Sequence, residues 1–237
     1  MENSKISLQK SKIDFLILVN IAFITLALCL INFSNIDLVI QKYLFDFETK
    51  SWLIDKDEPV KKFIFYQLPK ILMGIVIVTL LISSVLGFRK KSEFLAKNRH
   101  YIFLIFLGLS LIPLIAGNIK TFTNVYCPNR LEIFMGDVPY VKIFDSYPAD
   151  FHQKKKAKCF PAGHAVSGFA LMILFFGLRK KSHRLIGLAS GVILGWITGF
   201  YQMAKGAHFF GDTLVSMLVC FLLAALITRI YLNFQEL

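Results

Sequence analysis

Long apolar runs constrain this chain more than any other feature of its sequence. A helix that crosses a bilayer needs about 20 mostly apolar residues. Six runs are candidates, of which the fourth is the shortest: 15–34, 71–88, 101–118, 164–178, 185–204 and 213–232. Composition agrees, because 56% of the residues are hydrophobic and only 18% are charged, whereas soluble domains have about 45 to 50% and about 25%. The sequence therefore predicts an all-α, polytopic membrane bundle of six transmembrane helices.

The six runs take up about half of the chain, which leaves no room for a separate soluble domain. Residues 1–237 are therefore expected to form a single domain. The first run follows a basic start, which is also how a cleaved signal peptide begins. It is longer than a signal core and does not end in a small-x-small cleavage pattern. We interpret it as a retained first helix.

The orientation follows from the basic residues of the short loops, since Lys and Arg gather on the cytoplasmic side of a membrane protein. Basic clusters precede the first run and separate runs two and three and runs four and five: Lys5, Lys10 and Lys12; Arg89, Lys90, Lys91, Lys97 and Arg99; Arg179, Lys180, Lys181 and Arg184. Both termini are thus expected in the cytoplasm. Segments 35–70, 119–163 and 205–212 then lie on the outer side.

One of these outer segments, 119–163, has more basic than acidic residues. The basic ones are Lys120, Arg130, Lys142, Lys154, Lys155, Lys156 and Lys158, against Glu132, Asp137, Asp145 and Asp150. An anionic substrate would explain such a surplus on the side that is usually poor in Lys and Arg. A solvated loop near acidic lipid headgroups is the alternative.

The outer side also collects polar clusters at helix ends, and the most informative pair is His208 with Asp212. If the last helix begins near His208, the i, i+4 spacing puts both side chains on one face. The carboxylate then accepts the Nδ1 proton and leaves a free lone pair on Nε2. Such an imidazole is a nucleophile or a base. The same pattern also suits a metal site or a simple surface pair.

A second imidazole, His164, is expected at the start of another helix on the same side, where peptide N–H groups favour an anion. Gly163 allows a close approach of the backbone there, and Lys120 and Lys205 add cations that can hold a phosphate. Together these residues predict a phosphoryl-transfer site. No metal is expected, because the outer cysteines and histidines lack the usual zinc spacing, and no cofactor is expected either.

The combination of motifs resembles the type 2 phosphatidic acid phosphatase (PAP2) superfamily, in its bacterial membrane branch. The three parts of the signature are matched by Lys120 and Pro128, by Pro161, Gly163 and His164, and by His208 and Asp212. The resemblance covers runs three to six and implies six helices with the site on one face.

The chain departs from the family pattern at three places. Cys127 and Gln202 stand where the family usually has Arg, and Ala162 stands where it has Ser. Lys205 and Arg130 are candidates to replace the lost positive charge. The chain is more similar to a bacterial subgroup with Cys-Pro and Cys-Phe-Pro-Ala-Gly-His variants of the motifs.

The resemblance implies a metal-independent phosphatase of a lipid phosphate or diphosphate, facing the periplasm from a bacterial inner membrane. His208, oriented by Asp212, would form a phosphohistidine, while His164 would protonate the leaving oxygen and then activate water. The phosphate oxygens would be held by Lys120, Gln202, Lys205 and the Gly163 backbone N–H. Membrane lipids are the expected partners, and no nucleic acid is expected.

The sequence does not choose among lipid A phosphates, undecaprenyl diphosphate and phosphatidylglycerol phosphate as substrates. Two other functions stay open. The same covalent intermediate could be captured by a lipid hydroxyl, which would make the protein a phosphotransferase. The replaced phosphate ligands would also suit a non-catalytic lipid-binding or transport protein.

Two of the four cysteines lie beside these motifs. Cys127 precedes Pro128 and Cys159 lies two residues before Pro161, whereas Cys29 and Cys220 fall inside apolar runs. If the motifs converge on one phosphate, the two outer cysteines come close together, and the periplasm allows a disulfide to persist. We therefore expect a Cys127–Cys159 disulfide. The alternative is that each cysteine packs separately.

Overall fold

The computed structural model describes residues 2–56, 58–120, 122–153 and 155–234. Helices dominate these residues: α1 (Glu2–Phe33), α2 (Ile36–Lys42), α3 (Pro59–Lys62), α4 (Leu68–Phe88), α5 (Glu93–Ile119), α6 (Val166–Phe169), α7 (Leu174–Gly177), α8 (Lys181–Ala204) and α9 (Phe210–Phe234). Short 3-10 and π turns are η1 (Phe63–Gln67), η2 (Pro128–Arg130), η3 (Glu132–Phe134) and η4 (Ala170–Ile173). A two-stranded antiparallel sheet joins β1 (Phe45–Asp46) to β2 (Ser51–Trp52). The described chain is therefore an all-α bundle with one small hairpin.

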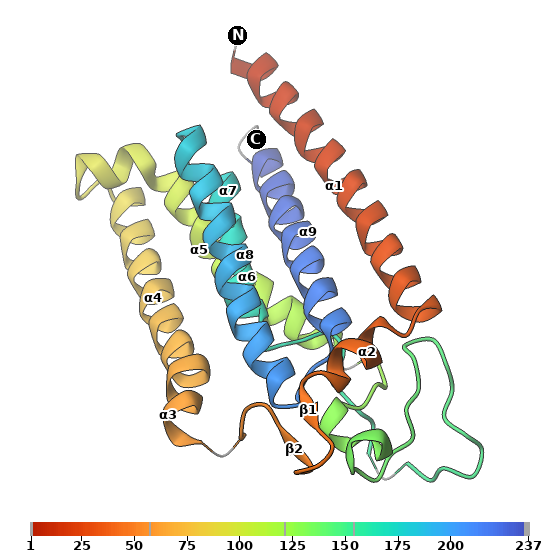
Figure 1. The fold of residues 1–237 in the computed structure, drawn as a ribbon. Helices are drawn as coiled ribbons and strands as arrows, with labels where there is room; N and C mark the ends of the chain where they lie inside the picture. The colour runs from red at the N-terminus through yellow and green to blue at the C-terminus, as the bar shows by residue number, and fades with distance from the viewer. Residues whose placement is uncertain (1, 57, 121, 154, 235–237) are drawn as a thin grey trace.

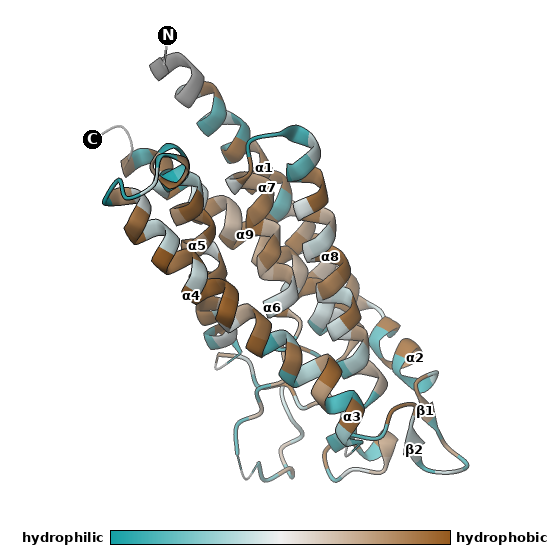
Figure 2. Cartoon of the chain, turned by 90° about the vertical axis from the view of Figure 1, so that its left-hand side faces the viewer, coloured by the Kyte–Doolittle hydropathy of each residue, from teal (hydrophilic) through white to brown (hydrophobic). Residues whose placement is uncertain are grey.

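Five helical segments of the described residues are long and apolar enough to cross a membrane. They are Ser7–Phe33, Pro59–Phe88, Glu93–Ile119, Lys181–Ala204 and Phe210–Phe234. In Figure 1 they run side by side, with α2, β1, β2 and the long loops gathered at one end of the bundle. Most residues of the long helices are apolar, as their brown colour in Figure 2 shows, and large apolar side chains such as Phe15 and Leu18 are exposed on the outside of the bundle. The multi-pass membrane prediction is confirmed.

The fourth predicted run differs from the expectation. Its helix is confined to Val166–Gly177, made of α6, η4 and α7. At 1.5 Å per residue this stretch is about 18 Å long, well short of a hydrocarbon core of about 30 Å. It ends where Leu178 turns to an extended conformation (φ −100°, ψ 147°). Five long helices, rather than six, are thus found in the described residues, and the short one returns the chain along the bundle from α5 toward α8 (Figure 1).

This short helix is the centre of the core, which explains why its sequence is so apolar. Phe169, Ala170 and Ile173 are completely buried. Close packing against α8 depends on glycines, because a Cβ on Gly168 would lie 2.5 Å from the backbone nitrogen of Gly195. The run is apolar because protein surrounds it, and hydropathy does not distinguish a protein interior from lipid.

At the loop end, an aromatic cluster holds the hairpin against the segment between α8 and α9. Trp52 packs on Phe45, with ring centroids 4.9 Å apart, and the cluster includes buried Phe209. Gly206 has φ +71°, and a Cβ there would lie 2.4 Å from the Trp52 ring. The Gly206 carbonyl also accepts a hydrogen bond of 2.9 Å from the Asn129 backbone N–H. These contacts position the turn that carries Lys205 and His208.

Candidate active site

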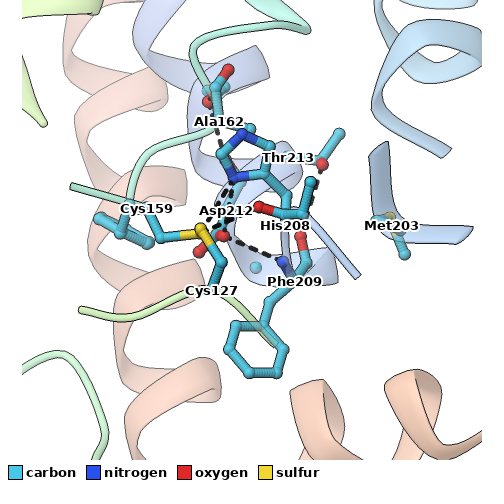
Figure 3. Close-up of polar contacts among 12 residues, drawn as sticks. Cys127, Cys159, Ala162, Met203, His208, Phe209, Asp212 and Thr213 are labelled. Atoms are coloured by element: carbon cyan, nitrogen blue, oxygen red, sulfur yellow. Dashed lines mark hydrogen bonds and ion pairs between the residues drawn. A yellow bond between two sulfur atoms is a disulfide. The ribbon is translucent and has the colours of Figure 1, made fainter. Parts of the chain in front are cut away.

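His208 and Asp212 form a buried pair at the start of α9. His208 Nδ1 lies 3.2 Å from Asp212 Oδ2, and the two residues are only 5% and 1% exposed. The helix begins at Phe210, two residues later than His208. Asp212 therefore lies in the first turn, where its Oδ2 also accepts the Phe209 backbone N–H at 2.9 Å. This second bond fixes the carboxylate, which in turn fixes the orientation of the His208 ring (Figure 3).

His164 lies on the turn before α6, and its ring faces that of His208. The two ring centroids are 5.7 Å apart. Burial lowers the pKa of His164 to about 3, and the neighbouring His208, Lys70, Lys205 and Lys120 add to the effect. The His164 imidazole is therefore neutral in the empty site at physiological pH, and an anion beside it would favour its protonated form.

A cavity of about 310 Å³ opens next to His164. It is lined by Lys56, Lys62, Tyr66, His164 and Lys205. Burial is the main cause that lowers the pKa of the Lys205 ammonium, and the charge of Lys62 lowers it further. The cavity is thus a small, positively charged space beside an imidazole, which suits a phosphate.

Lys120 and Gly163 complete the same region. A Cβ on Gly163 would lie 3.4 Å from the Lys120 Nζ. The Lys120 ammonium therefore lies in close contact with the backbone at Gly163. The structure brings together four of the residues that the sequence suggested for phosphate binding or acid–base chemistry: Lys120, Gly163, His164 and Lys205.

Two other suggested phosphate ligands lie elsewhere. Gln202 is only 1% exposed within α8, and its side-chain amide has no hydrogen-bond partner among the described residues. Arg130 makes an exposed, two-pronged ion pair with Asp137 at 2.8 and 3.0 Å. It lines an adjoining cavity of about 720 Å³, which shares Lys56 and Lys205 with the smaller one.

A disulfide joins Cys127 to Cys159, with the Cα atoms 5.2 Å apart. It ties the loop after α5 to the segment before α6 and lies directly against the buried pair, as Figure 3 shows. Cys159 Sγ is 3.4 Å from His208 Nδ1. The two sulfurs and the His208 ring are close enough together to hold a metal ion, but the bond between the sulfurs leaves no thiolate to act as a ligand.

Several residues of the site come from the first third of the chain, where no motif is visible in the sequence. Asp37 of α2 is buried, and its Oδ1 accepts the Gly211 backbone N–H at 2.7 Å. Burial, and then the charge of Asp212, raises the pKa of Asp37 to about 7. Tyr66 contacts His164 edge to face, with the centroids 5.0 Å apart. The lysines of segment 35–70 could have indicated an anion site in the sequence, but an equal number of acidic residues in the same segment balances their charge.

The bundle defines a multi-pass membrane protein, with His164 and His208 close together at its loop end. The sequence model of the PAP2 superfamily matches residues 100–236. The match covers more than half of the chain, including most of α5, all of α8 and α9, and both of these histidines, so the protein belongs to the PAP2 superfamily. Neither the curated proteins nor the solved structures contain a match.

Proposed function

We propose that this protein is a membrane lipid phosphatase, which hydrolyses a lipid phosphate monoester or diphosphate through a phosphohistidine on His208. The observation that carries the proposal is the pairing of His208 Nδ1 with Asp212 Oδ2 at 3.2 Å. This pairing leaves Nε2 as the free nitrogen. Membership of the PAP2 superfamily is consistent with this reaction class.

In the first step, His208 Nε2 attacks phosphorus as the bond from phosphorus to the lipid oxygen breaks. Asp212 stabilises the positive charge that develops on the ring. His164 is neutral before substrate binds, because its pKa is about 3. The negative charge of the bound phosphate raises this pKa, so His164 can then carry the proton that the leaving oxygen needs.

In the second step, water attacks the phosphohistidine. His164, now neutral, accepts a proton from the water, and His208 is released together with inorganic phosphate. Lys120, Lys205 and the Gly163 backbone N–H stabilise the equatorial oxygens, as positioning and charge dominate phosphoryl transfer. Arg130 could reach the substrate only after its ion pair with Asp137 opens, and Gln202 only after its buried side chain moves.

The setting we propose is a bacterial inner membrane, with six crossings, both termini in the cytoplasm and the site on the periplasmic face. The basic short loops support this orientation. Lipid A phosphates, undecaprenyl diphosphate and phosphatidylglycerol phosphate are the candidate substrates. We further propose membership of the subgroup with the Cys-Pro and Cys-Phe-Pro-Ala-Gly-His variants.

The test is phosphate release from a panel of these lipids by purified protein in detergent. His208→Ala and His164→Ala should each lower the rate by at least about 10²-fold, the minimum expected for such groups. His152→Ala, on an exposed part of the same outer loop, is the matched control and should keep the wild-type rate. A His208→Ala variant with more than about a hundredth of wild-type activity would refute the mechanism.

The same panel separates the other two functions. Label from a lipid diphosphate that appears on an acceptor lipid, and not as free phosphate, would identify a phosphotransferase. A wild-type protein that releases no phosphate from any lipid would favour the non-catalytic alternative. That alternative is suggested by Cys127, Ala162 and Gln202, which replace residues that usually hold phosphate oxygens.

A further inference from the structure

Part of the wall of the small cavity is built by a segment outside the PAP2 match. Lys56 precedes α3, Lys62 is its last residue, and both line the cavity with His164 and Lys205. The match begins only at residue 100. The motifs therefore supply part of the site, and the chain between β2 and α4 supplies another part.

Charge on this wall is strongly one-sided. Three of the described lining residues are lysines, and none is a carboxylate. Glu58, just before α3, is paired with Lys61 at 2.6 Å, and it and Asp55 line the adjoining larger cavity instead. Lys70 adds a fourth ammonium group, 3.7 Å above the Tyr66 ring. Gathering like charges is unfavourable unless an anion is bound between them, and more cations surround this space than one phosphate needs.

The lysines also fall into two groups around His164. Lys120 lies beside Gly163, next to the imidazoles. Lys56, Lys62 and Lys205 line the small cavity with His164, and Lys56 and Lys205 also line the larger one. A molecule with two linked phosphates could place one at the histidines and Lys205 and the other at Lys56 and Lys62.

We propose, building on the phosphatase function above, that Lys56 and Lys62 form a second phosphate subsite beside Lys205, and that the substrate is a lipid diphosphate. The terminal phosphate is held at His208, Lys120 and Lys205, and the phosphate attached to the lipid is held by Lys56 and Lys62. Lys56 and Lys62 are then specificity-determining residues.

The reaction balances with this placement. His208 Nε2 bonds to the terminal phosphorus, the bond to the bridging oxygen breaks, and its electron pair stays on the lipid monophosphate. The lysines of the second subsite stabilise the charge that builds up on that leaving group. Water then cleaves the phosphohistidine and releases inorganic phosphate.

The experiment compares a short prenyl diphosphate with the matching prenyl monophosphate. Lys56→Gln and Lys62→Gln keep the length of the side chains and remove the charge. We expect kcat/KM for the diphosphate to fall about tenfold for each lysine, as for a lost charge-assisted hydrogen bond, and kcat/KM for the monophosphate to change less than about threefold. Lys61→Gln, on the same helix but paired with Glu58, is the matched control and should resemble wild type.

Equal losses on both substrates, or no loss on the diphosphate, would overturn the proposal while leaving the phosphatase function intact. A second measurement does not depend on turnover. Isothermal titration of His208→Ala protein should show inorganic pyrophosphate binding at least tenfold more tightly than inorganic phosphate, and Lys56→Gln with Lys62→Gln should abolish the difference. Pyrophosphate that binds no more tightly than phosphate refutes the subsite, even if no lipid is hydrolysed.

Discussion

Removing the disulfide between Cys127 and Cys159 should destabilise the protein by an amount that follows from the loop it closes. The two cysteines are 32 residues apart. In the chain-entropy account, a cross-link that closes a loop of this length stabilises the fold by about 3 to 4 kcal/mol. For a chain of this size, 1 kcal/mol corresponds to about 2 to 4 °C in Tm. We therefore expect Cys127→Ser and Cys159→Ser each to lower Tm by roughly 6 to 16 °C.

The pattern among the variants is more diagnostic than the size of the shift. Either substitution opens the same loop, so the double variant should be no less stable than each single one. Cys29→Ser, at an exposed cysteine of α1, is the control and should keep the wild-type Tm. Activity should fall in both single variants as well, because Cys159 Sγ lies 3.4 Å from His208 Nδ1.

The assay is thermal unfolding in detergent, together with mass spectrometry of membranes alkylated without reductant. Wild-type protein should carry no label on Cys127 or Cys159 until a reductant is added. Labelling of both cysteines in freshly isolated, oxidised membranes would refute the bond. Single-variant losses that add up in the double variant would refute the loop argument, because two independent contacts would then be responsible.

Four further predictions concern the site and the orientation. Asp212→Asn should lower the hydrolysis rate by about 10³-fold or more but leave a trace above His208→Ala, since it disturbs only charge and tautomer; equal residual rates would contradict this. Calorimetry at pH 6 in buffers of different ionisation enthalpy should show that wild-type protein takes up a proton on binding phosphate and that His164→Gln does not. The pKa of Asp37 is raised to about 7, so the folded state keeps a proton that the unfolded state releases from about pH 4 upward, and stability falls as the pH rises between these two values. The Tm of Asp37→Asn should therefore rise relative to that of wild type between pH 4.5 and 7.5. A Tm difference between the two proteins that does not change with pH would exclude this role of Asp37. A reporter after Lys181 should be cytoplasmic and one near Lys155 periplasmic, and the reverse result would move the site to the cytoplasm.

The features that the sequence determined are local ones. A run of about 20 apolar residues needs no partner to be recognised as a membrane helix, and the structure confirms five such helices. The i, i+4 spacing of His208 and Asp212 predicted that their side chains would meet, and they do, although α9 begins only at Phe210 and His208 lies just before it. The fourth run shows the limit of this reasoning. Residues 166–177 form an apolar helix like the membrane spans, but this helix is buried in protein. In the sequence, only its shorter length distinguishes it from a membrane-spanning helix.

Only the tertiary structure decided which distant segments meet at the site. The 5.7 Å approach of His164 to His208 and the contact of Asp37 with Gly211 depend on how the helices pack. The lysine wall was hidden for a different reason. The charge count along residues 35–70 is close to zero, yet folding turns Lys56 and Lys62 toward the cavity while Glu58 pairs with Lys61. A charge count along the sequence does not say which way each side chain points, and only the fold decides that.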